Sequence, residues 1–452
     1  MSWIKISCIL CIFGCFKDFR PSDSFMTDYL TGPWKNFTPS EVNHEIYPVT
    51  TYSYLSTLVL MFLITDFVRY KPIIILCGLS GIVSLVLIIL GKVVRVLQLA
   101  KFFFGLFMSS EIAYYTYIYA KVDKIHYQEV TGFTKAASLL GRSMSGIAAQ
   151  LTASFGLLSY HQINFLTLSG TTFATVWALF LPSVKQSIYF HRASLNNENP
   201  TLQQNKETTD CLQKVRYQQM LSCGNNGGRY RALRKLRNAY AMLGKHFVQA
   251  YTNYYVIKWS IWWALSTCGY LMVATYSQLL WQTAVKPEDK IYNGAVDFLY
   301  AILGSVSVFS SGKAQLNWTV IGDKVCLVIA LLEGAIILGS SYCYNIWLLY
   351  AGYIVFSAIY HTMVTVASFE IAKCISEDSH GLIFGVNIFL ALLMQSLMTL
   401  LVVNTFTLDI RQQFHIYGCY FVILSVIFVI ITIVQYRHDT TQRKRDRIAN
   451  VE

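Results

Sequence analysis

Long apolar runs dominate this sequence and decide what it can fold into. A helix needs about 20 apolar residues to cross a bilayer, and such runs fall near residues 4–30, 47–66, 72–91, 96–120, 129–156 and 160–182, and again near 256–282, 291–312, 318–339, 344–373, 380–404 and 414–436. Hydrophobic residues make up 54% of the chain and charged residues only 13%, about half the charged share of a soluble domain. The chain is predicted to be an all-α polytopic membrane protein with about 12 transmembrane helices. Disordered chains, coiled coils, disulfide scaffolds and ordinary cytosolic enzymes are excluded.

A long polar segment divides the apolar runs into two sets of six. We expect an N-terminal six-helix bundle over residues 1–182, a basic linker loop over 183–255, a C-terminal six-helix bundle over 256–436 and a tail over 437–452. Six spans plus six around one long loop suggest two bundles related by an internal repeat, the architecture of major-facilitator transporters.

Basic residues predict the orientation of the chain. Lysine and arginine are concentrated in the linker and the tail, which is typical of cytoplasmic segments, so both termini are expected to be cytoplasmic. The net charge of +12 is then explained by orientation and by attraction to anionic membrane lipid, and no nucleic-acid partner is expected. Lys92, Arg95 and Lys101 disagree, because they flank a connection that this scheme places outside.

The same scheme exposes the loop over residues 31–46. Asn36-Phe37-Thr38 within it is a glycosylation sequon, so Asn36 is a predicted acceptor. The preceding run begins like a signal peptide, with Lys5 followed by apolar residues 6–16, but no small-residue cleavage pattern follows. We favour a first transmembrane helix interrupted by polar residues.

Ionisable groups inside spans are costly and therefore functional candidates. Glu111 lies near the middle of the fourth span, about one turn from Tyr114. A carboxylate beside aromatic rings suits an organic cation, and it is also a candidate carrier of a coupling proton. The alternative is a structural ion pair, for which the expected partner is Arg142 in the fifth span. Asp66 and Arg69, in a charged turn between the second and third spans, are interpreted as a cytoplasmic gate.

Motifs of soluble enzymes are missing from the sequence. It contains no G-x-S-x-G, no Walker loop, no histidine pair at i, i+4 spacing and no glycine-rich dinucleotide turn. Neither an enzymatic activity, nor a catalytic residue, nor a cofactor, nor a metal site is predicted.

Several blocks resemble the reduced folate carrier and thiamine transporter family. They are Arg20–Phe25, Tyr29–Thr38, Glu45–Leu55, Thr65–Pro72, Glu111–Tyr119, Ile291–Ala295 and Phe384–Asn387, in this order across almost the whole chain. The resemblance implies a plasma-membrane carrier that moves a water-soluble vitamin by alternating access, with its site near the midplane between the bundles.

The resemblance also implies particular site residues. Thiamine carriers are similar to this chain at Glu111 and Gln395, where folate carriers have an arginine and a lysine, and Tyr114 matches an aromatic contact of thiamine carriers. Asp23 and Glu45 match acidic positions of the family. Three departures count against thiamine: Thr50 replaces a tryptophan, Leu271 or Thr275 replaces an asparagine in the seventh span, and Arg142 is a base that thiamine carriers lack there.

These residues leave three hypotheses, two of which differ in the substrate and one of which has no vitamin uptake. The first hypothesis is a thiamine-like cation, with Glu111 supplying charge, Tyr114 and Tyr276 supplying aromatic contact, and Asp23, Glu45 and Gln395 supplying polar contact. The second is folate or another organic anion held by Arg142. The third is a family member that keeps the fold but takes up neither vitamin. A coupling proton or an exchanged anion is the expected partner of transport.

Overall fold

The computed structural model of the chain describes residues 3–68, 70–122, 126–184, 247–285, 290–313, 317–375 and 380–449, with a few isolated positions between 237 and 245. Within these ranges the chain is helical. The long helices are α1 (Trp3–Asp18), α4 (Tyr47–Val68), α5 (Lys71–Leu90), α6 (Val94–Lys121), α7 (Tyr127–Ser154), α8 (Tyr160–Ala178), α11 (Tyr254–Gln282), α12 (Asn293–Lys313), α13 (Trp318–Tyr342), α14 (Ile346–Cys374), α15 (His380–Met398) and α16 (Ile410–Ala449). Most of the expected linker 183–255 lies outside the described residues.

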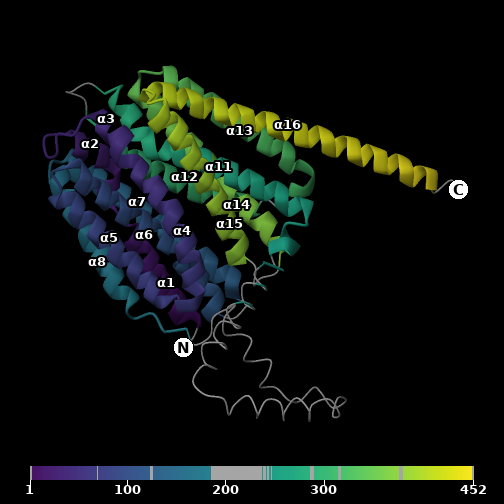
Figure 1. Ribbon diagram of the computed structural model, residues 1–452, viewed down its shortest axis with the longest axis horizontal. Helices are drawn as coiled ribbons and strands as arrows, with labels where there is room; N and C mark the ends of the chain where they lie inside the picture. The colour runs from purple at the N-terminus through teal and green to yellow at the C-terminus, as the bar shows by residue number, and fades with distance from the viewer. Residues whose placement is uncertain are drawn as a thin grey trace, which may run out of the picture.

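Each predicted span overlaps one of these helices, and the first and last spans differ from the prediction. The first span is not one helix: α1 is followed by a 3₁₀ turn, η1 (Pro21–Phe25), and a short helix, α2 (Met26–Thr31). The last helix, α16, continues through the expected tail to Ala449, and Figure 1 shows it extending beyond the rest of the bundle.

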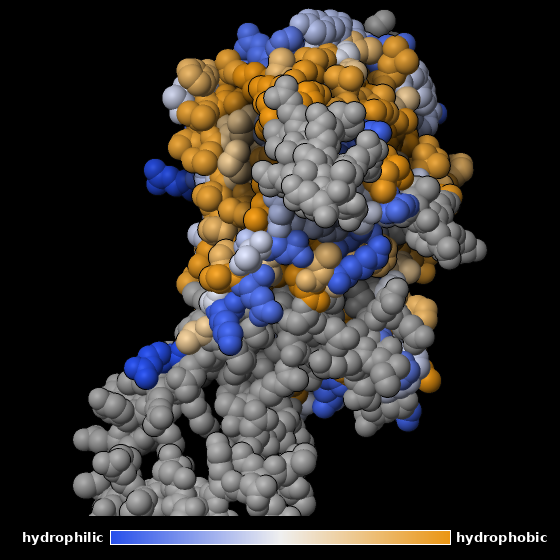
Figure 2. Space-filling view, turned by 90° about the vertical axis from the view of Figure 1, so that its right-hand side faces the viewer, coloured by the Kyte–Doolittle hydropathy of each residue, from blue (hydrophilic) through white to orange (hydrophobic). Residues whose placement is uncertain are grey.

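Judged by length and composition, five of the described helices are long and apolar enough to cross a membrane. They are Lys71–Leu90, Val94–Ile118, Ile346–Cys374, Gly381–Thr405 and Ile410–Ile433. Apolar side chains are exposed on the outer helices, for example Val328 of α13 and Ile430 of α16, and Figure 2 shows apolar residues spread over this flank of the molecule. A surface of this kind is stable against lipid rather than water.

The two halves of the chain repeat one packing scheme. In the N-terminal half α1 packs on α7 and α8, and α5 packs on α6 and α8; in the C-terminal half α11 packs on α15 and α16, and α13 packs on α14 and α16. The contacts between the halves follow the same rule, because α4 meets α15 and α7 meets α12. These pairings are those expected of two six-helix units related by an internal repeat.

A proline determines where the first span breaks. Pro21 lacks a backbone N–H and disfavours helical geometry in the residue before it, and Arg20 has φ −133° and ψ 70°. The free backbone N–H groups find side-chain acceptors: that of Arg20 donates to Ser145 Oγ (3.1 Å) and that of Ser22 to Thr167 Oγ1 (2.9 Å). Helices α7 and α8 therefore stabilise the break by accepting hydrogen bonds from its backbone.

The two ends of the bundle are packed differently. The end that carries α2 and the short helix α3 (Pro39–Glu41), here called the loop end, lies opposite the N-terminus in Figure 1. One hydrophobic cluster runs through the C-terminal half, with Tyr276 among its members, and includes loop-end residues of the N-terminal half such as Tyr29 and Tyr47. At the opposite end the N-terminal half has a separate cluster around Leu10, Phe13 and further residues of α5, α6 and α8. The N-terminal half thus shares a hydrophobic cluster with the C-terminal half through its loop-end residues.

Candidate functional site

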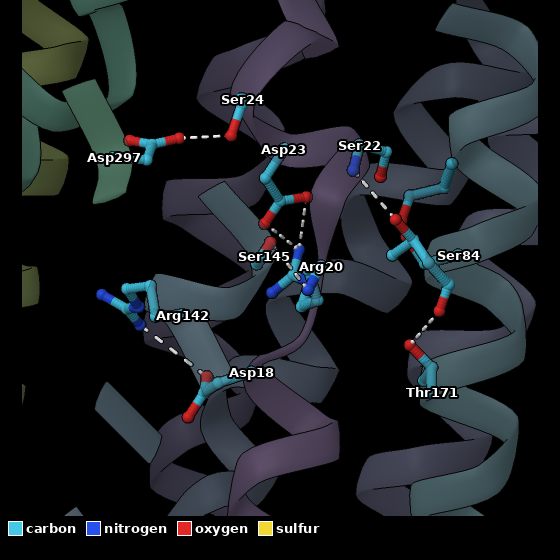
Figure 3. Close-up of polar contacts among 12 residues, drawn as sticks. Asp18, Arg20, Ser22, Asp23, Ser24, Ser84, Arg142, Ser145, Thr171 and Asp297 are labelled. Carbon is cyan, nitrogen blue, oxygen red and sulfur yellow. Dashed lines mark hydrogen bonds and ion pairs between the residues drawn. The ribbon is translucent and has the colours of Figure 1, made fainter. Parts of the chain in front are cut away.

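A chain of alternating charges lies where α1 ends, between α6 and α7. The Lys17 ammonium group forms an ion pair with Glu111 of α6 and lies 3.4 Å from Asp18 Oδ2. Asp18 Oδ1 in turn lies 3.7 Å from the guanidinium of Arg142 on α7, as Figure 3 shows. Lys17 and Asp18 are buried, whereas the side chain of Glu111 is 20% exposed and that of Arg142 is 42% exposed. The formal charges of these residues cancel.

The structure corrects the expected partner of Glu111. Its ion pair is with Lys17, 94 residues away in the sequence, and Arg142 pairs with Asp18 instead. The sequence contains a signal for this arrangement, because Lys17 and Asp18 interrupt an apolar run just before a proline. Charges in such a position need partners inside the bundle. The interpretation of Glu111 as part of an ion pair holds, with another base.

Asp23 lies on the 3₁₀ turn that follows the break. Its carboxylate pairs with Arg20, with Oδ2 2.7 Å from the guanidinium, and the Arg20 guanidinium lies 4.5 Å from the centroid of the Phe104 ring. The Asp23 side chain is 43% exposed. The adjacent Ser24 hydroxyl donates to Asp297 of α12, so this turn joins the two halves, as Figure 3 shows.

Aromatic residues of the C-terminal half face Arg142. The rings of Tyr270 and Tyr360 are stacked, with centroids 3.9 Å apart, and the Tyr270 hydroxyl shares a hydrogen bond with His361 Nε2 (3.3 Å). Tyr300 stacks on the same histidine at 6.0 Å. Arg142 lies near Tyr300 and Tyr270 of this group. Charges of one half thus meet aromatic rings of the other.

These tyrosines were not predicted from the sequence, and the two predicted aromatic contacts are buried within the bundle. Tyr114 is 1% exposed, its hydroxyl donates to the Leu10 carbonyl (3.0 Å) and its ring packs on Phe13. Tyr276 is fully buried, with its ring 6.2 Å from that of Tyr47. Both rings are occupied by packing here, and their contact with a substrate stays a prediction.

Gln395 lies at the contact between α15 and α4. It is buried, and its Nε2 donates to Thr51 Oγ1 (3.4 Å). Thr50, the preceding residue of α4, is half-buried. Gln395 of α15 therefore contacts α4 at Thr51, the residue that follows Thr50 in the sequence.

The remaining predicted residues lie nearer the ends of the molecule. Glu45 is exposed in the π-helical turn Val42–Ile46 before α4. Asn36 is exposed in the loop-end connection, with a left-handed φ of 57°, a backbone geometry that asparagine tolerates. The predicted gate is not part of this description, because the side chain of Asp66 and the whole of Arg69 lie outside the described residues.

Lys101 differs from its sequence expectation. It does not flank a connection but lies buried inside α6, with its ammonium group 5.0 Å from the Tyr47 ring and 5.4 Å from the Phe104 ring. The disagreement with the orientation predicted by basic residues is therefore smaller, because a base inside the bundle carries no information about which side a loop is on.

A polar network at the loop end was not predicted. Asp28 of α2 accepts hydrogen bonds from Gln282 Nε2 of α11 (2.9 Å) and Asn293 Nδ2 of α12 (3.2 Å). Gln150 of α7 donates to the Ile291 carbonyl (3.2 Å) and accepts from the Ala295 N–H (3.1 Å). We call the residues of this network the loop-end interface. No sequence motif marks it, because its members come from both halves.

The described residues contain no cluster of three or more His, Cys, Asp or Glu arranged to hold a metal ion. The site instead combines carboxylates, bases and aromatic rings at the level where the first span is broken. Ion pairing and contact with aromatic faces are the interactions that groups of this kind can offer to a small polar solute.

Comparisons with known proteins identify the family of the chain. A family model described as reduced folate carrier matches residues 1–416. Thiamine transporter 2 of Homo sapiens is 35% identical over 444 residues, which cover 95% of this chain and 90% of that protein. Folate-like transporter 2 of Caenorhabditis elegans is 33% identical and covers 94% and 96%.

A solved D-xylose-proton symporter is similar in fold. The TM-score is 0.61 at 12% sequence identity, and the alignment covers 94% of this chain and 97% of the symporter. At that identity the likeness supports the arrangement of helices and nothing about the solute.

Proposed function

Because the chain belongs to the reduced folate carrier family of membrane transporters, we propose that it carries a water-soluble vitamin across the plasma membrane, and that its substrate is a thiamine-like organic cation. The names of its relatives include both thiamine and folate transporters. The choice between them therefore depends on the site.

The observation that carries the choice of a cation is the pair of partly exposed carboxylates near the break in the first span. Glu111 and Asp23 present 20% and 43% of their side chains to solvent, although both lie on segments packed inside the bundle. Tyr270 and Tyr300 of the other half are buried and stack on Tyr360 and His361, so the choice of a cation depends on the carboxylates. A cation gains from charge pairing with such groups. Gln395 contributes no positive charge.

Alternating access is the proposed mechanism. Residues 1–182 and 256–436 form the two moving units, residues 183–255 form the cytoplasmic linker, and both termini lie in the cytoplasm. The loop end then faces the outside, and the loop-end interface closes it. In this orientation, opening toward the outside requires breaking the bonds of Asp28 and Gln150 across the halves.

The experiment is uptake of labelled thiamine and labelled folate by cells that express the chain, measured with surface expression. Thiamine uptake is expected, and Glu111→Gln is expected to reduce it at least tenfold, because the amide keeps the size of the side chain and removes its charge. Repeating the assay with and without a proton gradient, and with anions on the far side, identifies the coupling ion.

Two results contradict the proposal. Folate uptake that Glu111→Gln leaves unchanged, without thiamine uptake, assigns the protein to organic anions. Normal surface expression without uptake of either compound assigns it to members that do not carry these vitamins.

A further inference from the structure

The partner of Glu111 is a lysine of the protein itself, and this affects what the site can bind. The Lys17 ammonium group is buried and in contact with the Glu111 carboxylate. Its nitrogen also lies 5.7 Å from the centroid of the Tyr114 ring. A carboxylate beside an aromatic ring is the environment proposed above for the substrate cation, and in this structure a side-chain cation occupies it.

Lys17 has a second acceptor within reach. Asp18 Oδ2 lies 3.4 Å from the Lys17 nitrogen, and the other Asp18 oxygen lies 3.7 Å from Arg142. A lysine side chain is flexible and its three donors rotate freely. The ammonium group can therefore release Glu111 while it stays paired with Asp18, so that no buried charge is left alone.

We propose that Lys17 is a specificity-determining residue that competes with the substrate for Glu111. A cationic solute binds Glu111 only by displacing the ammonium group onto Asp18, so each binding event replaces one ion pair by another. Lys17 thereby weakens the binding of cations, and its return to Glu111 favours their release. An uncharged solute of the same shape gains nothing from the exchange. This inference rests on the proposed function, because it takes Glu111 as a substrate contact.

The test compares Lys17→Gln with the wild type in inhibition of labelled thiamine uptake. The inhibitors are unlabelled thiamine and thiochrome, its uncharged fused-ring analogue. Glutamine keeps a donor near Glu111 but removes the competing charge, so the inhibition constant of thiamine is expected to fall at least threefold while that of thiochrome stays the same. Lys17→Arg retains the charge and is expected to keep the wild-type ratio of the two constants.

A double variant separates local competition from overall charge. Lys17→Gln with Asp18→Asn removes one charge of each sign, so the formal net charge of the site is unchanged. Tighter binding of thiamine by the double variant supports competition at Glu111, whereas a return to the wild-type constant overturns it.

Other outcomes also overturn the inference, and they differ from failure of the proposed function. Equal shifts for thiamine and thiochrome indicate a structural role for Lys17, and so does a loss of maximal rate without a change in the inhibition constants. Loss of surface expression in both Lys17→Gln and Lys17→Arg likewise indicates a structural role. Absence of thiamine uptake in the wild type removes the proposed function and this inference together.

Discussion

A tight backbone contact between the two halves provides a sharp test of how the loop end closes. Gly146 of α7 and Gly294 of α12 face each other across the halves. A Cβ atom at Gly146 would lie 2.7 Å from the Gly294 carbonyl oxygen and 2.7 Å from the Phe298 nitrogen. Both contacts are with backbone, which cannot rotate away, so Gly146→Ala is expected to prevent the halves from packing this closely.

The size of the effect follows from the same distances. Ordinary contact begins at 3.4 Å, so the backbones must retreat by roughly 0.7 Å, and overpacking of this kind costs about 1–3 kcal/mol. The methyl group is in the way only when the loop end is closed. The full cost therefore acts on the equilibrium between closed and open states, which shifts by about 5- to 150-fold toward the open one.

Spin labels on the two halves measure this shift. Trp34 and Tyr344 are exposed side chains near the loop end, one in each half, and labels at these positions, in a background without native cysteines, report the distance between the halves. Gly146→Ala is expected to increase the population at long distance and to slow uptake. Gly132→Ala is the matched control, because Gly132 lies on the same helix as Gly146 and a Cβ atom there would have no contact within 4 Å. Identical distance distributions for the two variants would contradict this mechanism of closure.

Three further outcomes are expected. Gln282→Ala removes two hydrogen bonds to α2, to Asp28 and to Thr31, each contributing about 1 kcal/mol, so the same labels should report more opening; unchanged distances would show that the network does not hold the end closed. Lys258→Met leaves the buried Asp323 carboxylate, now 2.6 Å from the lysine nitrogen, without its charge partner, and should lower the stability of the detergent-solubilised protein by about 3–5 kcal/mol. Thermal unfolding should recover with Asp323→Leu added, and a double variant as unstable as the single one would mean that the loss does not come from an unpaired buried charge. Asn36→Gln should abolish a glycosidase-sensitive mass shift on gels, and a wild-type protein without that shift would count against an external loop end.

The positions of the helices could be predicted from the sequence, because each depends on a local property. A run of about 20 apolar residues has a stable place in a bilayer whatever its neighbours are. The break in the first span is also visible in the sequence, from Pro21 and the charges before it. The same reasoning does not give the end of α16, since a polar helix can continue past the apolar part of its sequence.

The partners of the charges could not be predicted, because they depend on how helices distant in the sequence are brought together. Glu111 and Arg142 stand out in the sequence as unusual, but the break at Arg20 brings Lys17 and Asp18 between them. The burial of Tyr114 also could not be predicted from the sequence. It depends on Tyr114 lying on the face of α6 that contacts Leu10 of α1.

Sequence alone is thus sufficient to recognise a membrane protein of two six-helix units, and to single out the ionisable residues that need an explanation. The three-dimensional arrangement was needed to show that Glu111 is paired with Lys17 and that α2, α7, α11 and α12 close one end. The two kinds of information differ in range. The insertion of an apolar run into the membrane depends on the residues of that run alone. Long-range ion pairs and hydrogen bonds instead depend on the distance in space between segments more than 90 residues apart in the sequence.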